Sequence, residues 1–394
     1  MLRKLRALLS GSIVTCYVRT RVLIVQPVVP HYRSKLYELL YQHLLQNGIE
    51  LQVAYGTPNA DQAAKRDLVD LPESIGLKVK NYWFFGGKVL YQPIFWRMLS
   101  ADLVIVLNAN GYLLNYPLSV VALLGRPKLA YWVWWKKLRT GEGSFTELLR
   151  RQITRAGQWW FAYTAGTRDY LLLDGMPSKQ ITVLNNSVDV SGFRAALAAV
   201  TTAELHDFAE VNHIPIDAPI GVFCGGLYGD KRLEFLFEAV KLIHADRPDF
   251  HLLVLGDGVM RDLVQHATGS DHRIHYLGPS FGKEKTLCFR LSKLFLCPGL
   301  VGLVILDAFA AGLPMITTDI PVHSPEIDYL NDGVNGLLIT DDVRVYAGEI
   351  VSLLGAESRL QELSNGALIS AQQYSIENMA EHFAEGIMSC LKYP

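Results

Sequence analysis

Short apolar runs alternate with helical patterns along almost the whole chain. In the first half, Val22–Val25 predicts a strand, and Ser34–Gln46 predicts a helix because leucines recur there at helical spacing before Asn47-Gly48 ends the pattern. Further strands are predicted at Leu51–Tyr55, Leu103–Leu107 and Lys128–Val133. Strands that alternate with helices in this way indicate a parallel sheet with helices on both faces.

The strand–helix pattern restarts after Asn185-Asn186-Ser187. A capping box from Thr201 to Glu204 predicts a helix start before the chain reaches Pro215 and Pro219. A second series of strands is predicted at Ile220–Cys224, His251–Leu255, Arg273–Tyr276, Leu294–Cys297 and Met315–Thr318. We therefore expect two Rossmann-like α/β domains with a boundary between residues 188 and 218, and ligands at the carboxyl ends of the strands.

These patterns divide the chain into four parts. Residues 1–20 form an N-terminal tail, residues 21–195 a first Rossmann-like domain, residues 212–375 a second one, and residues 376–394 a C-terminal helix. The C-terminal helix is amphipathic, which is compatible with packing back on the first domain.

The composition is that of a globular enzyme. The 394 residues carry a formal net charge of −1, which argues against a nucleic-acid binder because such proteins usually have a basic excess. No C-x-x-C pair occurs among the cysteines, so neither a disulfide framework nor a structural zinc site is predicted. A reduced, cytoplasmic protein is the simplest expectation.

Residues 1–20 bear on membrane contact. Arg3, Lys4, Arg6 and Arg19 lie among short apolar runs, and the longest uncharged stretch, Ala7–Val18, is too short to span a bilayer. Three interpretations stay open: a signal peptide, a loose terminus, and a cytoplasmic tail or interfacial helix. The first predicted strand follows immediately and leaves little room for cleavage. We therefore expect the third, with peripheral contact on the inner face of the cell membrane.

A glycine-rich segment from Phe223 to Arg232, F-C-G-G-L-Y-G-D-K-R, follows a predicted strand and opens a predicted helix. Glycines let the backbone approach a phosphate closely, and the start of a helix offers free N–H groups. Lys231 adds a full positive charge. The alternative is a glycine turn followed by a solvated Lys-Arg pair, because the spacing is that of neither the dinucleotide-binding motif nor the P-loop.

A second segment links two later strands. After Cys297, a loop with Gly299 and Gly302 leads to a predicted helix that begins near Leu303. Asp307 lies one turn inside this helix, where a carboxylate can accept hydrogen bonds from ribose hydroxyls while the helix N-terminus receives phosphates. The alternative is that Asp307 is an ordinary exposed helix residue.

Both segments resemble motifs of the retaining family 4 glycosyltransferases of the GT-B fold, in the same order and at a similar separation. Lys231 matches a lysine that contacts the donor diphosphate in that family, and Asp307 occupies the position of a glutamate that holds the donor ribose. With shorter matches at Val254–Gly258, Pro325-Glu326 and Asp332–Gly336, the similarity covers roughly residues 20–390. The resemblance implies an acceptor domain followed by a nucleotide-sugar donor domain, which face each other across a cleft.

The resemblance also implies site residues. Lys231 is the catalytic candidate. The donor-binding candidates are Gly225, Gly226, Arg232, Gly256, Gly302, Leu303, Val304 and Asp307.

Three positions depart from the family pattern. The family arginine falls at Gly226, for which Arg232 is the candidate replacement. The first glutamate of the second motif falls at Gly299, in a Pro-Gly-x-x-Gly-Leu form that resembles a branch of the family without this glutamate. A histidine that the family often carries near the cleft is absent from the corresponding stretch, Trp132–Lys137.

Candidate acceptor contacts lie at the predicted carboxyl edge of the first sheet. His31 and Arg33 lie in the link between the first strand and its helix, where they either meet an acceptor sugar or cap the helix. A second group of candidates follows a later strand: Trp132, Trp134, Trp135, Lys136, Lys137 and Arg139. Members of this group either bind a sugar face and a lipid-linked phosphate or pack as an ordinary strand.

The resemblance implies transfer of a sugar from a nucleoside diphosphate to an acceptor hydroxyl, with retention of configuration, in cell-surface polysaccharide or glycolipid synthesis. The expected partners are a nucleotide-sugar donor and a saccharide or lipid-linked saccharide acceptor. The chain has no Asp-x-Asp, the metal motif of the other main glycosyltransferase fold, so neither a cofactor nor a metal is expected. Two alternatives stay open: an epimerase or phosphorylase of the same fold, and a non-catalytic nucleotide-sugar-binding protein.

Overall fold

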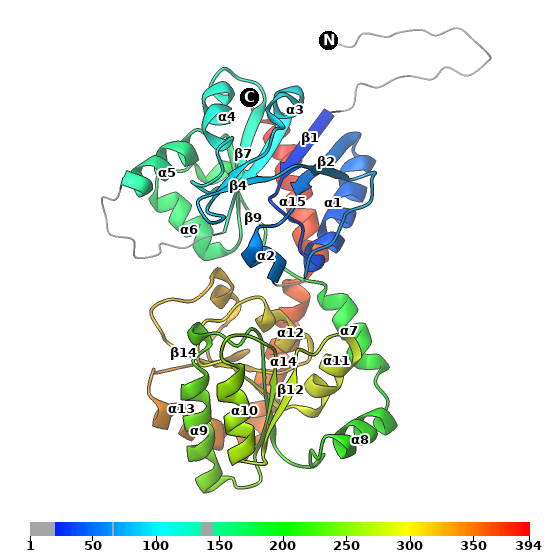
Figure 1. Cartoon of the computed structure of the whole chain (residues 1–394), viewed down its shortest axis with the longest axis vertical. Helices are drawn as coiled ribbons and strands as arrows, with labels where there is room; N and C mark the ends of the chain where they lie inside the picture. The colour runs from blue at the N-terminus through cyan, green and yellow to red at the C-terminus, as the bar shows by residue number, and fades with distance from the viewer. Residues whose placement is uncertain (1–19, 65–66, 135–144) are drawn as a thin grey trace, which may run out of the picture.

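The computed structural model describes residues 20–64, 67–134 and 145–394, which form two α/β domains (Figure 1). The predicted tail up to residue 19 and the candidates Trp135, Lys136, Lys137 and Arg139 lie outside the described residues. Four of the cysteines, Cys224, Cys288, Cys297 and Cys390, carry free thiols.

The first domain is built on a seven-stranded parallel sheet. In spatial order its strands are β3 (Gly76–Val79), β2 (Ile49–Gly56), β1 (Thr20–Val25), β6 (Leu103–Leu107), β7 (Lys128–Val133), β8 (Trp159–Ala162) and β9 (Ile181–Val183). The order reverses between β1 and β6. Such a switch point opens a crevice at the carboxyl ends of the strands, where ligands of α/β proteins bind.

Both faces of this sheet are buried, which explains why its strands are continuous apolar runs. Val22 and Ile24 of β1 pack in one cluster and Leu23 and Val25 in another, because successive side chains point to opposite faces. The covering helices are α1 (Ser34–Gln46), α3 (Phe95–Ser100), α4 (Asn115–Ala122), α5 (Phe145–Arg155) and α6 (Ala165–Leu173). Shorter elements are α2 (Ala60–Ala64), the 3₁₀ turns η1 (His31–Arg33) and η2 (Ser178–Gln180), and a two-stranded hairpin of β4 (Tyr82–Phe84) and β5 (Val89–Tyr91).

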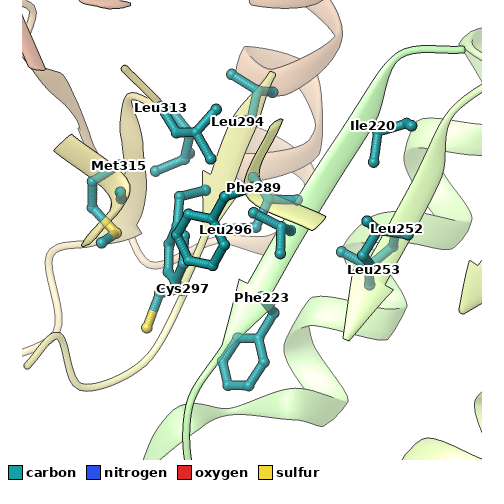
Figure 2. Close-up of a cluster of buried hydrophobic side chains, with 14 of the residues drawn as sticks. Ile220, Phe223, Leu252, Leu253, Phe289, Leu294, Leu296, Cys297, Leu313 and Met315 are labelled. Carbon is teal, nitrogen blue, oxygen red and sulfur yellow. The ribbon is translucent and has the colours of Figure 1, made fainter. Parts of the chain in front are cut away.

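The second domain has a six-stranded parallel sheet. In order its strands are β12 (Ile274–Gly278), β11 (His251–Leu255), β10 (Ile220–Cys224), β13 (Leu294–Leu296), β14 (Met315–Thr318) and β15 (Gly336–Ile339), so the switch point lies between β10 and β13. Figure 2 shows the core around these central strands, where Phe223, Leu252 and Leu296 are among the fully buried side chains.

Helices of this domain surround the sheet. They are α7 (Val190–Ala199), α8 (Thr202–Val211), α9 (Leu233–Asp246), α10 (Arg261–Ser270), α11 (Gly282–Leu291), α12 (Val304–Ala310), α13 (Val343–Gly355) and α14 (Glu357–Gln373), with 3₁₀ turns η3 (Gly229–Lys231) and η4 (Pro325–Tyr329). Val190 and Leu197 of α7 and Ala209 of α8 are buried in the core of the second domain. The crossover between the domains therefore lies near Asn186, just before the predicted interval 188–218, and α7 packs on the second domain although the predicted first domain extends to residue 195.

The last helix, α15 (Ile376–Lys392), returns to the first domain, where Figure 1 shows it beside α1. Its buried face, which includes Met379, Phe383 and Ile387, packs in the same cluster as Leu36 and Leu40 of α1. Phe383 also contacts the Trp132 ring, with the ring centres 5.1 Å apart. The chain therefore crosses between the domains twice.

The loops that follow the carboxyl ends of strands in the two sheets contact each other. Gly166, after β8, donates its N–H to Asp328 Oδ2 at 2.8 Å, and Asp328 belongs to η4, after β14. Asn186, after β9, donates from Nδ2 to Glu326 Oε1 at 2.8 Å, and its carbonyl accepts from the Tyr329 hydroxyl. The two carboxyl edges, each with its switch point, therefore face one another.

Most predicted elements are confirmed. The helix Ser34–Gln46 and the strands Leu103–Leu107, Lys128–Val133 and His251–Leu255 have the bounds that the patterns predict. The capping box at Thr201 and Glu204 is formed in both directions. The sequence patterns miss the edge strands β3, β9 and β15, the hairpin strands β4 and β5, and the internal strand β8. All of them are three or four residues long.

A cluster of histidines lies at the amino edge of the second sheet. His251, the first residue of β11, stacks on His275, and its Nδ1 lies 2.9 Å from His275 Nε2. Burial, followed by the charges of His275, His272, His244 and Arg273, lowers the pKa of His251 to about 4. Burial also lowers the pKa of His275. Both rings are therefore favoured in the neutral form in the folded state.

Acid should consequently destabilise this domain before carboxylates protonate. The unfolded chain takes up a proton on His251 near pH 6.5, whereas the folded chain resists it down to about 4, so stability is full above 6.5 and is lost as the pH falls through that window. Between pH 7 and pH 5 the free energy of unfolding should drop by on the order of 2 kcal/mol. Urea unfolding at several pH values measures this drop. His251→Gln should show a smaller drop, and an equal drop in both proteins would contradict the assignment.

Candidate active site

Two loops meet at the switch point of the second sheet. One follows β10 (residues 225–232) and the other follows β13 (residues 297–303). The Leu300 N–H donates to the Asp230 carbonyl at 2.8 Å. A Cβ atom on Gly299 would lie 2.3 Å from that same carbonyl oxygen, so only glycine fits there with this backbone. The glutamate that the resemblance leads one to expect at this position would not fit this backbone.

The loop after β10 is also bound to the loop after β11. Gly225 donates its N–H to the Leu255 carbonyl, and Leu227 donates to the Asp257 carbonyl. Gly256 has a φ of 139°, and a Cβ atom there would lie 1.8 Å from the Gly225 carbonyl oxygen. The candidates Gly225 and Gly256 are therefore in backbone contact, which a side chain on Gly256 would prevent.

Lys231 lies where these loops meet. It ends the 3₁₀ turn η3, and its ammonium group donates a hydrogen bond to the Leu300 carbonyl of the second loop. Its side chain is half-buried. The cation is therefore held at the switch point by a neutral oxygen, which an anionic ligand can replace.

Arg232 is the next residue, but its charge is already paired. Its backbone is left-handed, with a φ of 57°, which is uncommon outside glycine and marks the start of α9. The guanidinium lies 2.6 Å from Asp341 Oδ1 and donates to the Thr318 hydroxyl, at the ends of β15 and β14. At Gly226 a Cβ atom would lie 2.3 Å from the Tyr228 ring.

The second loop leads through Gly302 and Leu303 into α12, which begins at Val304. The first intrahelical bonds run from Ile305 and Leu306 back to Gly302 and Leu303. The N–H groups of Gly302, Leu303 and Val304 come before these bonds. The first N–H groups of a helix have no partner within the helix, so these three can bind a ligand or solvent.

Asp307 is neither free nor an ordinary exposed residue. Its Oδ2 lies 2.7 Å from the ammonium group of Lys285 on α11, and both side chains are largely buried. Lys285 also lies over the Phe193 ring, 4.9 Å from its centre. Burial lowers the pKa of Lys285, but the Asp307 carboxylate and then the Cys224 thiol oppose this, and the net shift is upward. Lys285 is thus charged and fixes the Asp307 carboxylate. No sequence motif indicates this role of Lys285.

At the switch point of the first sheet lies a cavity of about 380 Å³. It opens at the carboxyl ends of β1, β6 and β7, and its walls include the aromatic residues Tyr32, Tyr37, Tyr112, Trp132, Trp134 and Tyr163. Burial raises the pKa of Tyr112 and Tyr163 to about 12, so both phenols stay protonated at neutral pH. Aromatic faces beside hydroxyl groups suit a sugar ring, which has both apolar and polar surfaces.

Two buried donors at this cavity have no partner among the described residues. They are Trp132 Nε1 and Gln26 Nε2, and both residues line the cavity. A buried donor without a hydrogen bond is costly, and such exceptions in native proteins are often satisfied by ligand or water. Trp132 and Trp134, which the sequence leaves undecided between sugar contact and strand packing, both belong to this wall.

The other two acceptor candidates differ from each other. His31 is exposed, and its N–H donates to the Asp67 carbonyl. Arg33 is buried: it donates to Asn186 Oδ1 and to the Tyr163 hydroxyl, and its guanidinium carbon lies 5.0 Å from the centre of the Trp132 ring. Burial disfavours its charge, whereas Tyr163, Tyr32, Tyr37 and Glu326 favour it, and the pKa of Arg33 is raised. Arg33 thus joins the cavity wall to the junction between the domains.

No three His, Cys, Asp or Glu side chains of the described part are grouped so as to hold a metal ion. Within the same ranges, no helix combines the length and the apolar character that crossing a bilayer requires.

Solved structures share this architecture. HepE of Anabaena in complex with UDP matches with a TM-score of 0.69 at 13% identity, over 94% of this chain and all of that one. A glycosyltransferase of Rickettsia africae matches with a TM-score of 0.71 at 16% identity, over 96% and 100%. The protein has the GT-B fold. A UDP-GlcNAc 2-epimerase of Neisseria meningitidis, bound to UDP-GlcNAc, also matches this chain, with a TM-score of 0.59 at 15% identity. The match covers 94% of this chain and 100% of the epimerase.

A family and two relatives are similar to this chain in sequence. Residues 218–356 match the family described as glycosyl transferases group 1. An exopolysaccharide phosphotransferase of Streptomyces coelicolor is 29% identical over 168 residues, which are 40% of this chain and only 17% of that relative. The α-D-kanosaminyltransferase of Streptomyces kanamyceticus is 21% identical over 325 residues, 80% of this chain and 78% of that protein.

Proposed function

We propose that this protein is a retaining glycosyltransferase, with a nucleoside-diphosphate sugar bound in the second domain and an acceptor in the first. One observation carries the proposal: the loops after β10 and β13 meet at the switch point with Lys231 between them, opposite an aromatic cavity in the other domain. The match of residues 218–356 to glycosyl transferases group 1 supports it, as do the complexes of HepE with UDP and with UDP-glucose.

In the proposed reaction the sugar–phosphate bond breaks and negative charge develops on the leaving diphosphate. Lys231 can exchange the Leu300 carbonyl for a phosphate oxygen, and the N–H groups at the start of α12 lie on the adjoining loop. Charges and dipoles that are fixed before the reaction stabilise such a transition state without reorganising. The proton of the attacking hydroxyl passes to the leaving phosphate in the mechanism that the resemblance implies, so no protein nucleophile is assigned.

The acceptor is proposed to bind in the aromatic cavity. Trp134 offers a half-exposed ring, and the free donors on Trp132 and Gln26 can be satisfied by sugar hydroxyls. A saccharide or lipid-linked saccharide of a cell-surface polysaccharide or glycolipid fits these groups. The relative named as an exopolysaccharide phosphotransferase supports this direction.

The two alternatives to a glycosyltransferase would have different outcomes in an activity assay. The epimerase of the same fold would return a changed nucleotide sugar, and a binding protein would return no product. A thermal-shift screen against nucleoside diphosphates tests the shared premise, because a ligand that binds only the folded state raises the melting temperature. No shift with any nucleoside diphosphate at millimolar concentration would contradict donor binding in the second domain.

Lys231→Ala should abolish most transfer while the fold is kept. Loss of a preorganised charge next to a developing negative charge costs a few kcal/mol, so kcat/KM should fall by about 100- to 1,000-fold. Lys241→Ala, an exposed lysine on α9, is the matched control and should behave as the parent. Near-parental kcat/KM in a folded Lys231→Ala protein would remove Lys231 from the reaction.

Asp307→Asn should weaken the contact to the donor ribose. Lys285 binds Oδ2, and within the described residues Oδ1 has no protein partner, so it can accept from ribose hydroxyls. An ionised acceptor is worth roughly 1.5–3 kcal/mol. Titration with UDP and 2′,3′-dideoxy-UDP separates this effect from fold damage: the parent should prefer the ribonucleotide by about tenfold or more, and Asp307→Asn should not. An unchanged preference would show that Asp307 does not touch the ribose.

We also propose that transfer needs no metal ion, since Lys231 and backbone N–H groups supply the positive charge that metal-using enzymes obtain from a cation. Activity should survive EDTA, with modest stimulation by Mg²⁺ through the substrate allowed. Complete loss in EDTA that Mg²⁺ or Mn²⁺ restores would overturn this part of the mechanism.

A further inference from the structure

The β4–β5 hairpin presents aromatic side chains on the surface of the first domain. Tyr82 pairs with Tyr91 and Phe84 with Val89. Because side chains alternate between the faces of a strand, these residues share one face. Tyr82, Phe84 and Tyr91 are exposed, whereas Leu90 on the opposite face is buried. The hairpin therefore has a packed inner face and an aromatic outer face.

The tip of the hairpin adds a further ring. Phe85 is 81% exposed and has a φ of 52°, and Gly86 and Gly87 continue in the left-handed region with φ of 65° and 85°. A bulky side chain is rare in this region because its Cβ crowds the following carbonyl. The fold thus keeps Phe85 in an unfavourable backbone conformation although its ring is mainly in contact with solvent. The packing of the domain does not explain this conformation.

The hairpin is fixed to the domain at both strands and at the turn. Trp83 Nε1 donates to the Thr57 carbonyl at 3.0 Å, and Asn59 Nδ2 donates to the Gly87 carbonyl at 3.2 Å. The Leu90 N–H donates to the Gly111 carbonyl at 2.8 Å. The exposed rings therefore project from a hairpin that hydrogen bonds attach to the domain.

The segment that contains the hairpin carries only positive charges, although the whole chain has a net charge of −1. Residues 74–101 contain no Asp or Glu, and they contain Lys78, Lys80, Lys88 and Arg97. Lys78 is paired with Asp70, whereas Lys80 lies over the Tyr82 ring, 4.9 Å from its centre. Lys80 and Lys88 are both exposed. Cations thus border the aromatic face on the hairpin itself.

We propose that this surface, which we call the hairpin face (Lys80, Tyr82, Phe84, Phe85, Lys88 and Tyr91), docks on an anionic lipid bilayer. Aromatic rings partition to the boundary between lipid headgroups and acyl chains, and lysines beside them attract anionic headgroups. A second copy of the chain would bring the same positive charge to this face. Residues 1–19 are also basic, so they suit the same bilayer better than they suit the hairpin face.

The hairpin face adjoins the proposed acceptor cavity. Asn81 Nδ2 donates to the Pro27 carbonyl at 2.7 Å and Gln92 Nε2 to the Gln26 carbonyl at 3.1 Å, at the two ends of the hairpin. Gln26 and Pro27 line the cavity. A docked protein would therefore hold its cavity beside the membrane, where a lipid-linked acceptor resides. This consequence rests on the proposed function, whereas vesicle binding does not.

Co-sedimentation of the full-length protein with vesicles tests the docking. The parent should bind vesicles of phosphatidylcholine with phosphatidylglycerol and should bind pure phosphatidylcholine vesicles much more weakly. Phe84→Ser/Phe85→Ser and Lys80→Glu/Lys88→Glu should each lower the apparent affinity by about tenfold or more. Phe281→Ser removes a phenylalanine that is 74% exposed on the other domain, and it should bind as the parent does. Melting curves check that each variant is folded.

A full-length variant with Arg3, Lys4 and Arg6 changed to Gln separates the tail from the hairpin face. It should retain binding that Phe84→Ser/Phe85→Ser then removes. Docking through the hairpin face is overturned if the parent does not bind anionic vesicles, or if the hairpin variants bind as the parent does. It is also overturned if the hairpin variants bind normally but change the oligomeric state, because the hairpin face would then bind a second copy.

Discussion

A buried guanidinium lies at the junction of the two domains, where it holds the asparagine that hydrogen-bonds to the second domain. Arg33 comes from the loop after β1, Asn186 from the crossover between the domains, and Glu326 from the turn after β14. Taking a charge out of water is costly unless polar groups surround it, and here Asn186 and Tyr163 accept its hydrogen bonds while aromatic rings flank it. These partners come from separate segments, so only one arrangement of the segments satisfies them all. The carboxyl edges that carry the aromatic cavity and the loop around Lys231 are thereby kept facing each other.

The geometry of the proposed donor side follows from close contact between backbones. Gly299 lies against Asp230, and Gly256 lies against Gly225, at distances that leave no room for a side chain. These contacts bring the loops after β10, β11 and β13 together at the switch point, where Lys231 rests on the Leu300 carbonyl. A diphosphate would meet a positive charge and backbone N–H groups that are already positioned. The ion pair of Lys285 with Asp307 holds the nearby carboxylate in the same way.

The sequence predicts the two parallel-sheet domains well because both central sheets bury their two faces. Continuous apolar strands and evenly spaced leucines, as in Ser34–Gln46, are strong local signals that tertiary contacts reinforce. The hairpin is missed for the opposite reason. Tyr82-Trp83-Phe84-Phe85 is apolar at every position, so the sequence shows no alternation although only one face of the hairpin is packed.

Contacts between distant segments are what the sequence does not reveal. Lys285 and Asp307 are 22 residues apart on different helices, and no spacing rule connects them. The amphipathic pattern of α15 shows that one face is buried but does not identify α1 as its partner. Arg33 looks like any polar residue in a loop after a strand, and its burial depends on Asn186, 153 residues later.

The chemistry proposed for the donor is tested most directly by identifying the nucleotide that the protein releases. The protein is incubated with a panel of nucleoside-diphosphate sugars, UDP-glucose first, and the products are separated by chromatography and examined by NMR. The GT-B site around Lys231 predicts release of the nucleoside diphosphate, with the sugar transferred to an acceptor or slowly to water with retention of configuration. Release of a nucleoside monophosphate would indicate transfer of a phosphosugar, and an epimerised donor would indicate an epimerase; either result would contradict sugar transfer from a diphosphate.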